Sequence, residues 1–448
     1  MSDPAAPDGI PVRYPLSSQQ VAVCEDPDPS GFVLPFAMRI TGHVDTDALR
    51  GALDDLVERH HVMRTLVNPG TDGEAGYQMV LPPLTVPFTV HDLAPQPGRS
   101  RDEIADELLI ALHTQKMDMY QLPLLRAALY RFDDGDAVLT ILTHHGVGDG
   151  WSCNLLRRDL AALYRARTTG TAHELAEPRQ YWEYGTWQQE WLTSERATTS
   201  REYWKNKLDG AAVYTMPADR PNGTGVLRSP YQSAGFVVEA DDFAAVEAHA
   251  GSLRCSGWHA LLAAGVLLGE RLRGWPEVTM MTNTSGRTDR SFNNTLGFFA
   301  DFVPIRVRLD DCVTYQDVLL RSRSTCLEAY RHLIPISILE QDTPTLPQPN
   351  DVPVNLPFVF NYSRPLVGTE EIQFADGVDL MALPKEEPSD RGGWHFWTMW
   401  RHPSGELRGV IEYAPDLVDS STVELWISEF VNLLSLITTA PHENRKGR

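Results

Sequence analysis

One stretch of this chain constrains its fold more than any other: a glycine-rich turn at residues 144–152 (HHGVGDGWS) stands between two runs of different periodicity. Before the turn, residues 138–142 (VLTIL) are apolar and rich in β-branched side chains, which predicts a short buried strand. After it, leucines recur at helical spacing through residues 155–163, which predicts a helix. A tight strand-to-helix connection of this kind is typical of α/β proteins.

Two adjacent histidines and an Asp-Gly pair make this turn a candidate site. A helix start offers free backbone N–H groups and a partial positive charge. His145 can take a proton from an attacking amine or hydroxyl, because an imidazole titrates at about 6.5. Asp149 can orient the turn or cap the helix, and Gly150 lets a substrate approach the backbone.

Two other interpretations of the same residues stay open. A histidine at a strand end is often structural, and an aspartate before a glycine is often an ordinary cap or turn. His144, His145 and Asp149 are also possible metal ligands. Adjacent side chains on an extended backbone point in opposite directions, so both histidines rarely reach one ion. We therefore favour acid–base chemistry without a metal.

The order of predicted elements is similar in the two halves of the chain. In the first half, a strand-like run at residues 35–44 is followed by an acidic turn and a helical pattern. In the second half, the alternating run and acidic turn at residues 235–243 are also followed by a helical pattern. This order and the length of 448 residues suggest two α/β (α+β) lobes. The expected domains are an N-terminal lobe at 1–178, a helical bridge and linker at 179–225, and a C-terminal lobe at 226–448.

Composition excludes several classes of protein. Lys and Arg number 39 against 60 Asp and Glu, a net charge of −21, which disfavours a nucleic-acid partner. The most apolar stretch, residues 260–269, is shorter than the roughly 20 residues of a membrane span, so no membrane association is expected. The N-terminus does not resemble a secretory signal, which favours a cytoplasmic location. The five cysteines are widely spaced without a Cys-x-x-Cys pair, and we interpret them as buried or inert thiols.

The turn also resembles a known motif. HHGVGDGWS (144–152) is similar to the HHxxxDG motif of condensation domains from nonribosomal peptide synthetases, in the chloramphenicol-acetyltransferase-like superfamily. Other segments resemble further motifs of that family in the same order: YPLSSQQ (14–20), RHHVMRT (59–65), YWEYGTWQQEWL (181–192), TNTSGR (282–287), LGFFADFVPIRV (296–307) and LRGVIEYAPDLVD (407–419). Together they extend over nearly the whole chain, so the resemblance is specific.

The resemblance implies two chloramphenicol-acetyltransferase-like lobes in a V-shaped pseudo-dimer, with a central tunnel and the double-histidine turn at its middle. It implies no cofactor bound by the enzyme itself. The donor acyl group is carried as a thioester on the phosphopantetheine arm of a carrier protein acting in trans. A small-molecule amine or alcohol is the acceptor.

The resemblance also implies roles for single residues. His145 is the catalytic histidine, as a base or as a positioner of the nucleophile. Asp149 is structural and is held by an arginine that matches Arg287, although Arg287 can also be a solvated strand-end side chain. Arg157 and Arg158, on the predicted helix, can contact an acidic carrier protein or form an ordinary solvated face.

Three departures from the family pattern concern the acceptor side and partner contacts more than the chemistry. Residues 300–301 are Ala-Asp in place of Val-Asn. The stretch 331–340 keeps His332 and Pro335 without the usual His-Gln-Asp order. A proline-rich run at 341–357 stands where the family has an Arg-Asp-x-Ser-Arg motif.

These features predict a free-standing condensation enzyme that joins a carrier-bound acyl or aminoacyl group to an amine or a hydroxyl. Two lobes of this family account for the length of the chain. The alternatives are a non-catalytic recruitment domain of the same fold, an epimerising relative, and an acyl-CoA-dependent acyltransferase. The plant-type members of the last class carry an Asp-Phe-Gly-Trp-Gly element that this sequence lacks.

Overall fold

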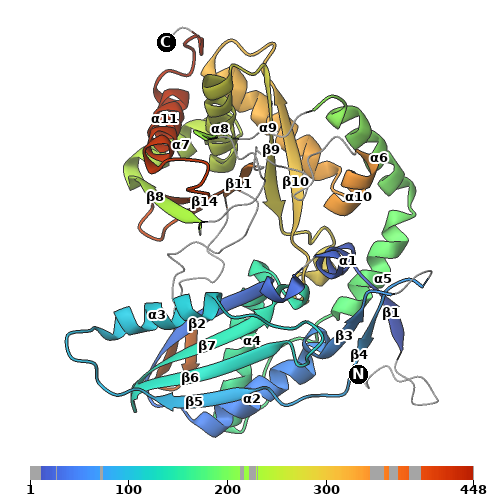
Figure 1. Ribbon diagram of the computed structural model, residues 1–448, viewed down its shortest axis with the longest axis vertical. Helices are drawn as coiled ribbons and strands as arrows, with labels where there is room; N and C mark the ends of the chain where they lie inside the picture. Colours follow the sequence, from blue (N-terminus) through green and yellow to red (C-terminus); the bar gives the residue numbers. More distant parts are fainter. Residues whose placement is uncertain are drawn as a thin grey trace. The chain divides into compact units, whose positions relative to one another are not determined.

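The computed structural model describes residues 12–26, 28–70, 74–211, 216–220, 229, 231–343, 358–362, 372–382 and 395–446. Helices and strands mix throughout this part of the chain, which confirms the expected α/β class (Figure 1). The chain folds into two compact units, each assembled from separate stretches of the sequence. Unit 1 comprises Met1–Ser194, Ser285–Ala300 and Pro365–Glu386, and unit 2 comprises Glu195–Thr284, Asp301–Arg364 and Glu387–Arg448.

Unit 1 is built on a six-stranded sheet with the order β12-β13-β2-β7-β6-β5 and a smaller sheet with the order β1-β4-β3. Its strands are β1 (Arg13–Pro15), β2 (Val33–Thr41), β3 (Thr65–Asn68), β4 (Tyr77–Val80), β5 (Phe88–Asp92), β6 (Leu125–Asp133), β7 (Asp136–His144), β12 (Ile372–Ala375) and β13 (Val378–Ala382). Its helices are α1 (Ser18–Glu25), α2 (Thr46–Arg59), α3 (Arg101–His113), α4 (Gly150–Thr169) and α5 (Tyr181–Leu192), with 3₁₀ turns η1 (Pro29–Gly31), η2 (His61–Arg64), η3 (His145–Val147) and η4 (Arg290–Phe292).

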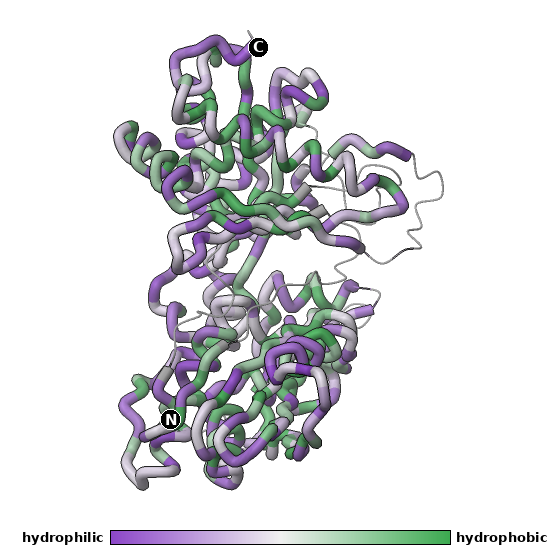
Figure 2. The backbone as a smooth tube through the Cα atoms, turned by 90° about the vertical axis from the view of Figure 1, so that its left-hand side faces the viewer, coloured by the Kyte–Doolittle hydropathy of each residue, from purple (hydrophilic) through white to green (hydrophobic). Residues whose placement is uncertain are grey.

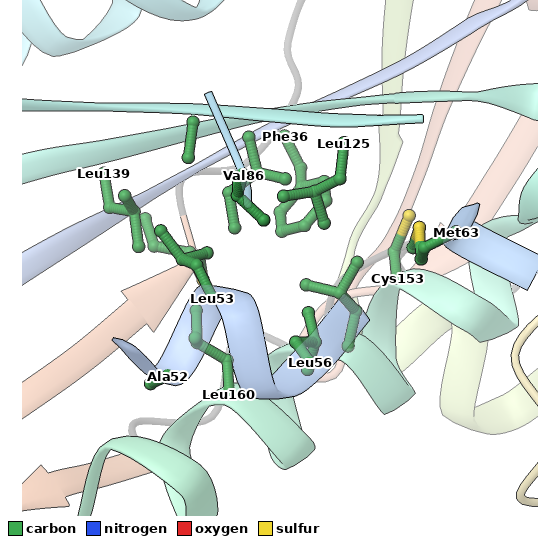
Figure 3. Close-up of a cluster of buried hydrophobic side chains, with 14 of the residues drawn as sticks. Phe36, Ala52, Leu53, Leu56, Met63, Val86, Leu125, Leu139, Cys153 and Leu160 are labelled. Atoms are coloured by element: carbon green, nitrogen blue, oxygen red, sulfur yellow. The ribbon is translucent and has the colours of Figure 1, made fainter. Parts of the chain in front are cut away.

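Alternation along the central strands of unit 1 sends side chains to both faces of the sheet. Phe36 on β2 and Leu139 on β7 meet Leu53 and Leu56 of α2 and Leu160 of α4 on one face (Figure 3). The neighbouring residues on β2 and β7, Ala37 and Val138, join a second cluster with Ala105 and Leu109 of α3. The strand before the double-histidine turn is therefore buried on both faces, which gives the turn a rigid base.

Unit 2 has its own six-stranded sheet with the order β10-β9-β11-β14-β15-β8. Its strands are β8 (Gln232–Val238), β9 (Glu277–Thr284), β10 (Asp301–Arg308), β11 (Phe358–Tyr362), β14 (His395–Arg401) and β15 (Leu407–Tyr413). Its helices are α6 (Glu195–Leu208), α7 (Ala240–Ser252), α8 (Gly257–Arg273), α9 (Tyr315–Arg331), α10 (Ile336–Asp342) and α11 (Ser420–Thr439).

The core of unit 2 joins its sheet to the helices packed on it. Trp397 of β14 packs edge-to-face on Phe430 of α11, with ring centroids 5.2 Å apart. Residues 260–269 of α8 are buried throughout. In both units, hydrophobic residues run along the strands and the covering helices, and hydrophilic residues prevail in the outer turns (Figure 2). None of the helices in the described part of the chain combines the length and apolarity that crossing a membrane requires.

The two units differ from the expected domains 1–178, 179–225 and 226–448 in two ways. Segments 285–300 and 365–386 belong to unit 1, although both follow residue 226. β13 pairs with β2 in antiparallel register, so a strand from late in the chain extends the sheet of unit 1. The expected helical bridge is not a separate body, because α5 belongs to unit 1 and α6 to unit 2.

Candidate active site

The double-histidine turn lies where β7 ends at His144 and α4 begins at Gly150, as the periodicity predicts. The His144 ring is fully buried, and both of its nitrogens bond to the backbone. Its Nε2 lies 2.8 Å from the carbonyl oxygen of Pro29, and its Nδ1 accepts from the Gly146 N–H at 2.9 Å. Because a carbonyl only accepts, Nε2 carries the proton and the ring is neutral. Burial lowers the pKa of His144, although the bond to Pro29 opposes that shift.

His145 has different surroundings from its neighbour. Its backbone N–H donates to the carbonyl of Phe32 at 2.6 Å, which fixes the residue at the strand end. The side chain is only half-buried. Its ring lies 4.3 Å from the ring of Phe298 and 6.4 Å from that of Phe32, measured between centroids. Of the two histidines in the turn, only His145 is partly exposed to solvent.

Asp149 is the N-cap of α4 and is 2% exposed. Its Oδ1 accepts from the Ser152 N–H at 2.8 Å, and its Oδ2 accepts from the N–H groups of Phe299 and Ala300 at 3.0 and 3.1 Å. Oδ2 also accepts from Nη1 of Arg287 at 2.8 Å. Both carboxylate oxygens are thus engaged in holding the backbone, and the geometry is that of a structural carboxylate.

The ionised form of the Asp149 carboxyl is stabilised by its neighbours. Burial by itself raises the pKa of this carboxyl, but the Arg287 guanidinium and the hydrogen bonds from Ser152 outweigh burial and hold the pKa below its usual range. The Arg287 side chain is 1% exposed, so it is not the solvated strand-end arginine of the alternative interpretation. Its guanidinium lies over the Phe299 ring, 4.1 Å from the centroid.

Gly286 explains how Arg287 reaches this position. Its φ is +64°, a conformation that favours glycine, and a Cβ built there would lie 1.7 Å from the carbonyl oxygen of Phe299. Gly150 is the first residue of α4, and its carbonyl accepts from Nδ2 of Asn154 at 3.2 Å. Its expected role, close approach of a substrate to the backbone, stays a prediction.

The prediction that Arg157 and Arg158 are both exposed on α4 is wrong for Arg157. That residue is 5% exposed, because its position on α4 faces the interior of unit 1. Arg158 is accessible, with 43% of its side chain exposed, but its Nε donates to Oδ1 of Asp159 at 2.7 Å. Its Nη1 also donates to Oδ1 of Asn294 at 2.9 Å. Of this pair, Arg158 is the residue that stays accessible, and its contact with a carrier protein stays a prediction.

The sequence reasoning missed a second buried carboxylate on α4. The Asp159 side chain is fully buried and bonds to Nε of Arg59 at 3.1 Å and to Nε2 of His60 at 2.9 Å. Burial raises the pKa of Asp159, but the bonds from His60 and Arg158 outweigh burial and lower it. Burial lowers the pKa of His60 despite the carboxylate beside it. The available signal in the sequence was the pair Arg59-His60 at the end of one predicted helix, together with Asp159 among the leucines of another.

No three His, Cys, Asp or Glu side chains gather into a possible metal site within the part of the chain that the structure describes. The backbone bonds at both nitrogens of His144 are themselves incompatible with metal ligation by that ring. The five cysteines are free thiols. Cys153, in the first turns of α4, is buried, and burial and the nearby charge of Asp149 raise its pKa to about 12.

Comparison with known proteins assigns the family. The model of the Condensation domain family matches residues 12–446. The chain belongs to this family. The condensation domain is 31% identical over 459 residues to the probable non-canonical nonribosomal peptide synthetase CymA of Salinispora arenicola, covering 98% of this chain and 6% of that protein. It is 32% identical over 335 residues to phosphinothricin tripeptide synthetase PhsC of Streptomyces viridochromogenes, covering 73% of this chain and 31% of that protein. It thus spans a small part of these relatives.

Solved structures of the same fold match almost the whole domain. The SgcC5 protein of Streptomyces globisporus superposes with a TM-score of 0.83 at 29% identity, covering 96% of this chain and 100% of that chain. The X-domain from teicoplanin biosynthesis superposes with a TM-score of 0.82 at 22% identity, covering 97% of each chain. The second likeness is evidence for the shared fold alone.

Proposed function

We propose that this condensation domain is an acyltransferase. It joins an acyl or aminoacyl thioester, carried on the phosphopantetheine arm of a partner carrier protein, to the amine or hydroxyl of a small-molecule acceptor. The observation that carries the proposal is the contrast within the double-histidine turn. Both nitrogens of His144 are bound by the backbone, whereas the His145 ring is half-exposed on a turn held by Asp149 and Arg287.

In the proposed reaction, the acceptor nitrogen or oxygen attacks the thioester carbonyl carbon. A C–N or C–O bond forms, the C–S bond breaks, and the acceptor proton passes through the His145 imidazole to the departing phosphopantetheine thiolate. The chain's contribution is to hold that imidazole at a fixed place beside the reacting groups, which reduces the entropic cost of bringing them together. No metal or bound cofactor takes part in this proposal.

The carrier-bound donor is supported by membership of the family, whose relatives include nonribosomal peptide synthetases. Both classes of acceptor belong in the test. The structure of SgcC5 contains (R)-(-)-1-(2-naphthyl)-1,2-ethanediol, a compound with two hydroxyl groups, which supports testing alcohols beside amines.

The experiment offers one acyl group in two forms, linked to a carrier protein and as its coenzyme A thioester, with an amine and an alcohol as acceptors. Contacts to the carrier surface add binding energy that free coenzyme A lacks, so we expect a markedly higher kcat/KM for the carrier-linked donor. Equal efficiency for the two donors would contradict carrier dependence and favour an acyl-CoA-dependent acyltransferase. No product from either donor with either class of acceptor would favour a recruitment domain.

A further inference from the structure

Segment 297–300 of unit 1 is held against the start of α4 by its N–H groups. The Gly297 N–H donates to Oγ of Ser152 at 3.1 Å, and the N–H groups of Phe299 and Ala300 donate to Asp149. This side of the segment is therefore fixed to the residues that cap the helix. The carbonyl of Gly297 also accepts from Oγ of Ser152 at 2.7 Å, whereas the carbonyls of Phe298 and Phe299 accept from other partners, Tyr181 and Gln19.

The carbonyl of Phe298 accepts from the hydroxyl of Tyr181, the first residue of α5. A carbonyl cannot donate, so the single phenol proton is used in this bond. Oγ of Ser17 lies 2.8 Å from the Tyr181 oxygen and must donate its own proton to it. Ser17 in turn accepts from the Gln20 N–H at 3.1 Å. The bonds form a chain with one direction, from Gln20 through Ser17 and Tyr181 to Phe298.

Tyr181 is closely packed as well as hydrogen-bonded. It is 1% exposed, and its ring packs edge-to-face on Phe299 with centroids 5.1 Å apart. A Cβ at Gly297 would lie 2.0 Å from this ring, so only glycine allows the approach. Burial raises the pKa of Tyr181 well above its usual value, so the hydroxyl stays protonated and keeps its donor.

The series of hydrogen bonds ends at Phe298, whose ring lies beside His145. The ring of Phe298 lies 4.3 Å from the His145 ring and also packs on the small cluster of Leu16, Val23, Val67 and Met119. A backbone shift at residue 298 would move this ring relative to the imidazole. The Tyr181 hydroxyl is thus the group that fixes the carbonyl side of the residue against which His145 rests.

We propose that Tyr181 is a positioning residue for His145: its hydroxyl, oriented by Ser17, fixes Phe298 and through it the imidazole. This inference rests on the proposed function for its effect on turnover. Its geometric part, the coupling of Tyr181 to the His145 ring, does not. Ser17 and Tyr181 lie in segments 14–20 and 181–192, both of which resemble motifs of the family.

The test is Tyr181→Phe, which removes the hydroxyl and keeps the ring. With a carrier-linked donor we expect kcat to fall by about tenfold or more while KM changes by less than about threefold, because the variant binds substrates but misplaces the imidazole. The ring resonances of His145 in an NMR spectrum should shift, a readout that requires no substrate. The matched control is Tyr184→Phe, because Tyr184 is 4% exposed on the same helix and its hydroxyl accepts from Gln188 rather than bonding to Phe298.

Ser17→Ala supplies an independent perturbation of the same chain. We expect its effect on kcat to be smaller than that of Tyr181→Phe and not additive with it, because both variants break one series of bonds. Ser17 also caps α1 with a capping box, so Ser100→Ala, which breaks the equivalent box at α3, controls for loss of a cap.

The outcomes separate the inference from the proposed function. A loss of kcat no greater than that of Tyr184→Phe, or unshifted His145 resonances in Tyr181→Phe, would overturn the positioning role. Wild-type turnover by His145→Ala together with shifted His145 resonances in Tyr181→Phe would reject the proposed function and leave the geometric coupling intact.

Discussion

Two buried aspartates belong to the region of α4: Asp149 caps its start, four residues after His145, and Asp159 lies within the helix and bonds to His60. Asp149 bonds to Arg287 and to backbone N–H groups, and the turn that it fixes presents a half-exposed His145. Asp159 bonds directly to His60, which is 2% exposed. The comparison teaches that two histidines beside buried carboxylates can differ in burial, which residue type alone does not reveal.

The largest effect on stability is expected from Asp149→Ala. This change leaves the buried Arg287 guanidinium without its carboxylate and frees the N–H groups of residues 299 and 300, so we expect a loss of roughly 3–5 kcal/mol in the free energy of unfolding. Thermal melting and the yield of soluble protein measure it. A variant that melts like the wild type and is merely slow would move Asp149 into the chemistry.

Asp159→Asn should destabilise the protein somewhat less, by about 3 kcal/mol, the lower end of the range for breaking a buried pair. Arg158, one of its partners, has 43% of its side chain exposed and can be solvated after the change. The folded fraction should turn over at the wild-type rate, because the contacts of Asp159 do not include the turn. A fall in kcat comparable with that of a site variant would break the distinction between the two aspartates.

The buried histidines predict a pH dependence of stability. The folded-state pKa values of His60 and His144 are lowered, so below about pH 6.5 the unfolded chain binds protons that the folded chain does not. Stability is therefore fully present above that pH and falls on acidification. His60→Gln should reduce the slope by up to about 1.4 kcal/mol per pH unit, measured by urea unfolding between about pH 5 and 7. An unchanged slope, equal to that of the exposed control His43→Gln, would contradict the burial account.

The smallest effect is expected at the surface of α4. Arg158→Gln should change the kcat/KM for a carrier-linked donor by less than about threefold, since partly exposed ion pairs contribute about 0–1 kcal/mol and this guanidinium is already bound to Asp159. Titration with the carrier protein at low and high salt measures it. A tenfold loss that disappears at high salt would restore Arg158 as a carrier contact.

The sequence predicted those parts of the molecule that depend on local pattern. The apolar run before the turn and the leucine spacing after it correctly placed β7 and α4. A strand buried on both faces is continuously apolar, and a helix buried on one face has apolar residues at helical spacing, so both patterns can be recognised locally. The family motif brought Arg287 to attention, and the structure pairs it with Asp149.

Other features depend on contacts between segments far apart in the chain, which local periodicity does not encode. The pairing of β13 with β2 is one example, and the bond from Tyr181 to Phe298 is another. Arg157 was misjudged for a related reason: a charged side chain on a helix was assumed to face solvent, but the packing of unit 1 buries it.

The central claim, that His145 performs the chemistry on a turn whose other polar groups are structural, is tested most directly by the turnover of His145→Ala with a carrier-linked donor. We expect kcat to fall by at least about 10²–10⁴, as for loss of a general base, with the melting temperature unchanged. The exposed His43→Ala, also in unit 1, should keep wild-type turnover. Near-normal turnover by a well-folded His145→Ala would contradict the account.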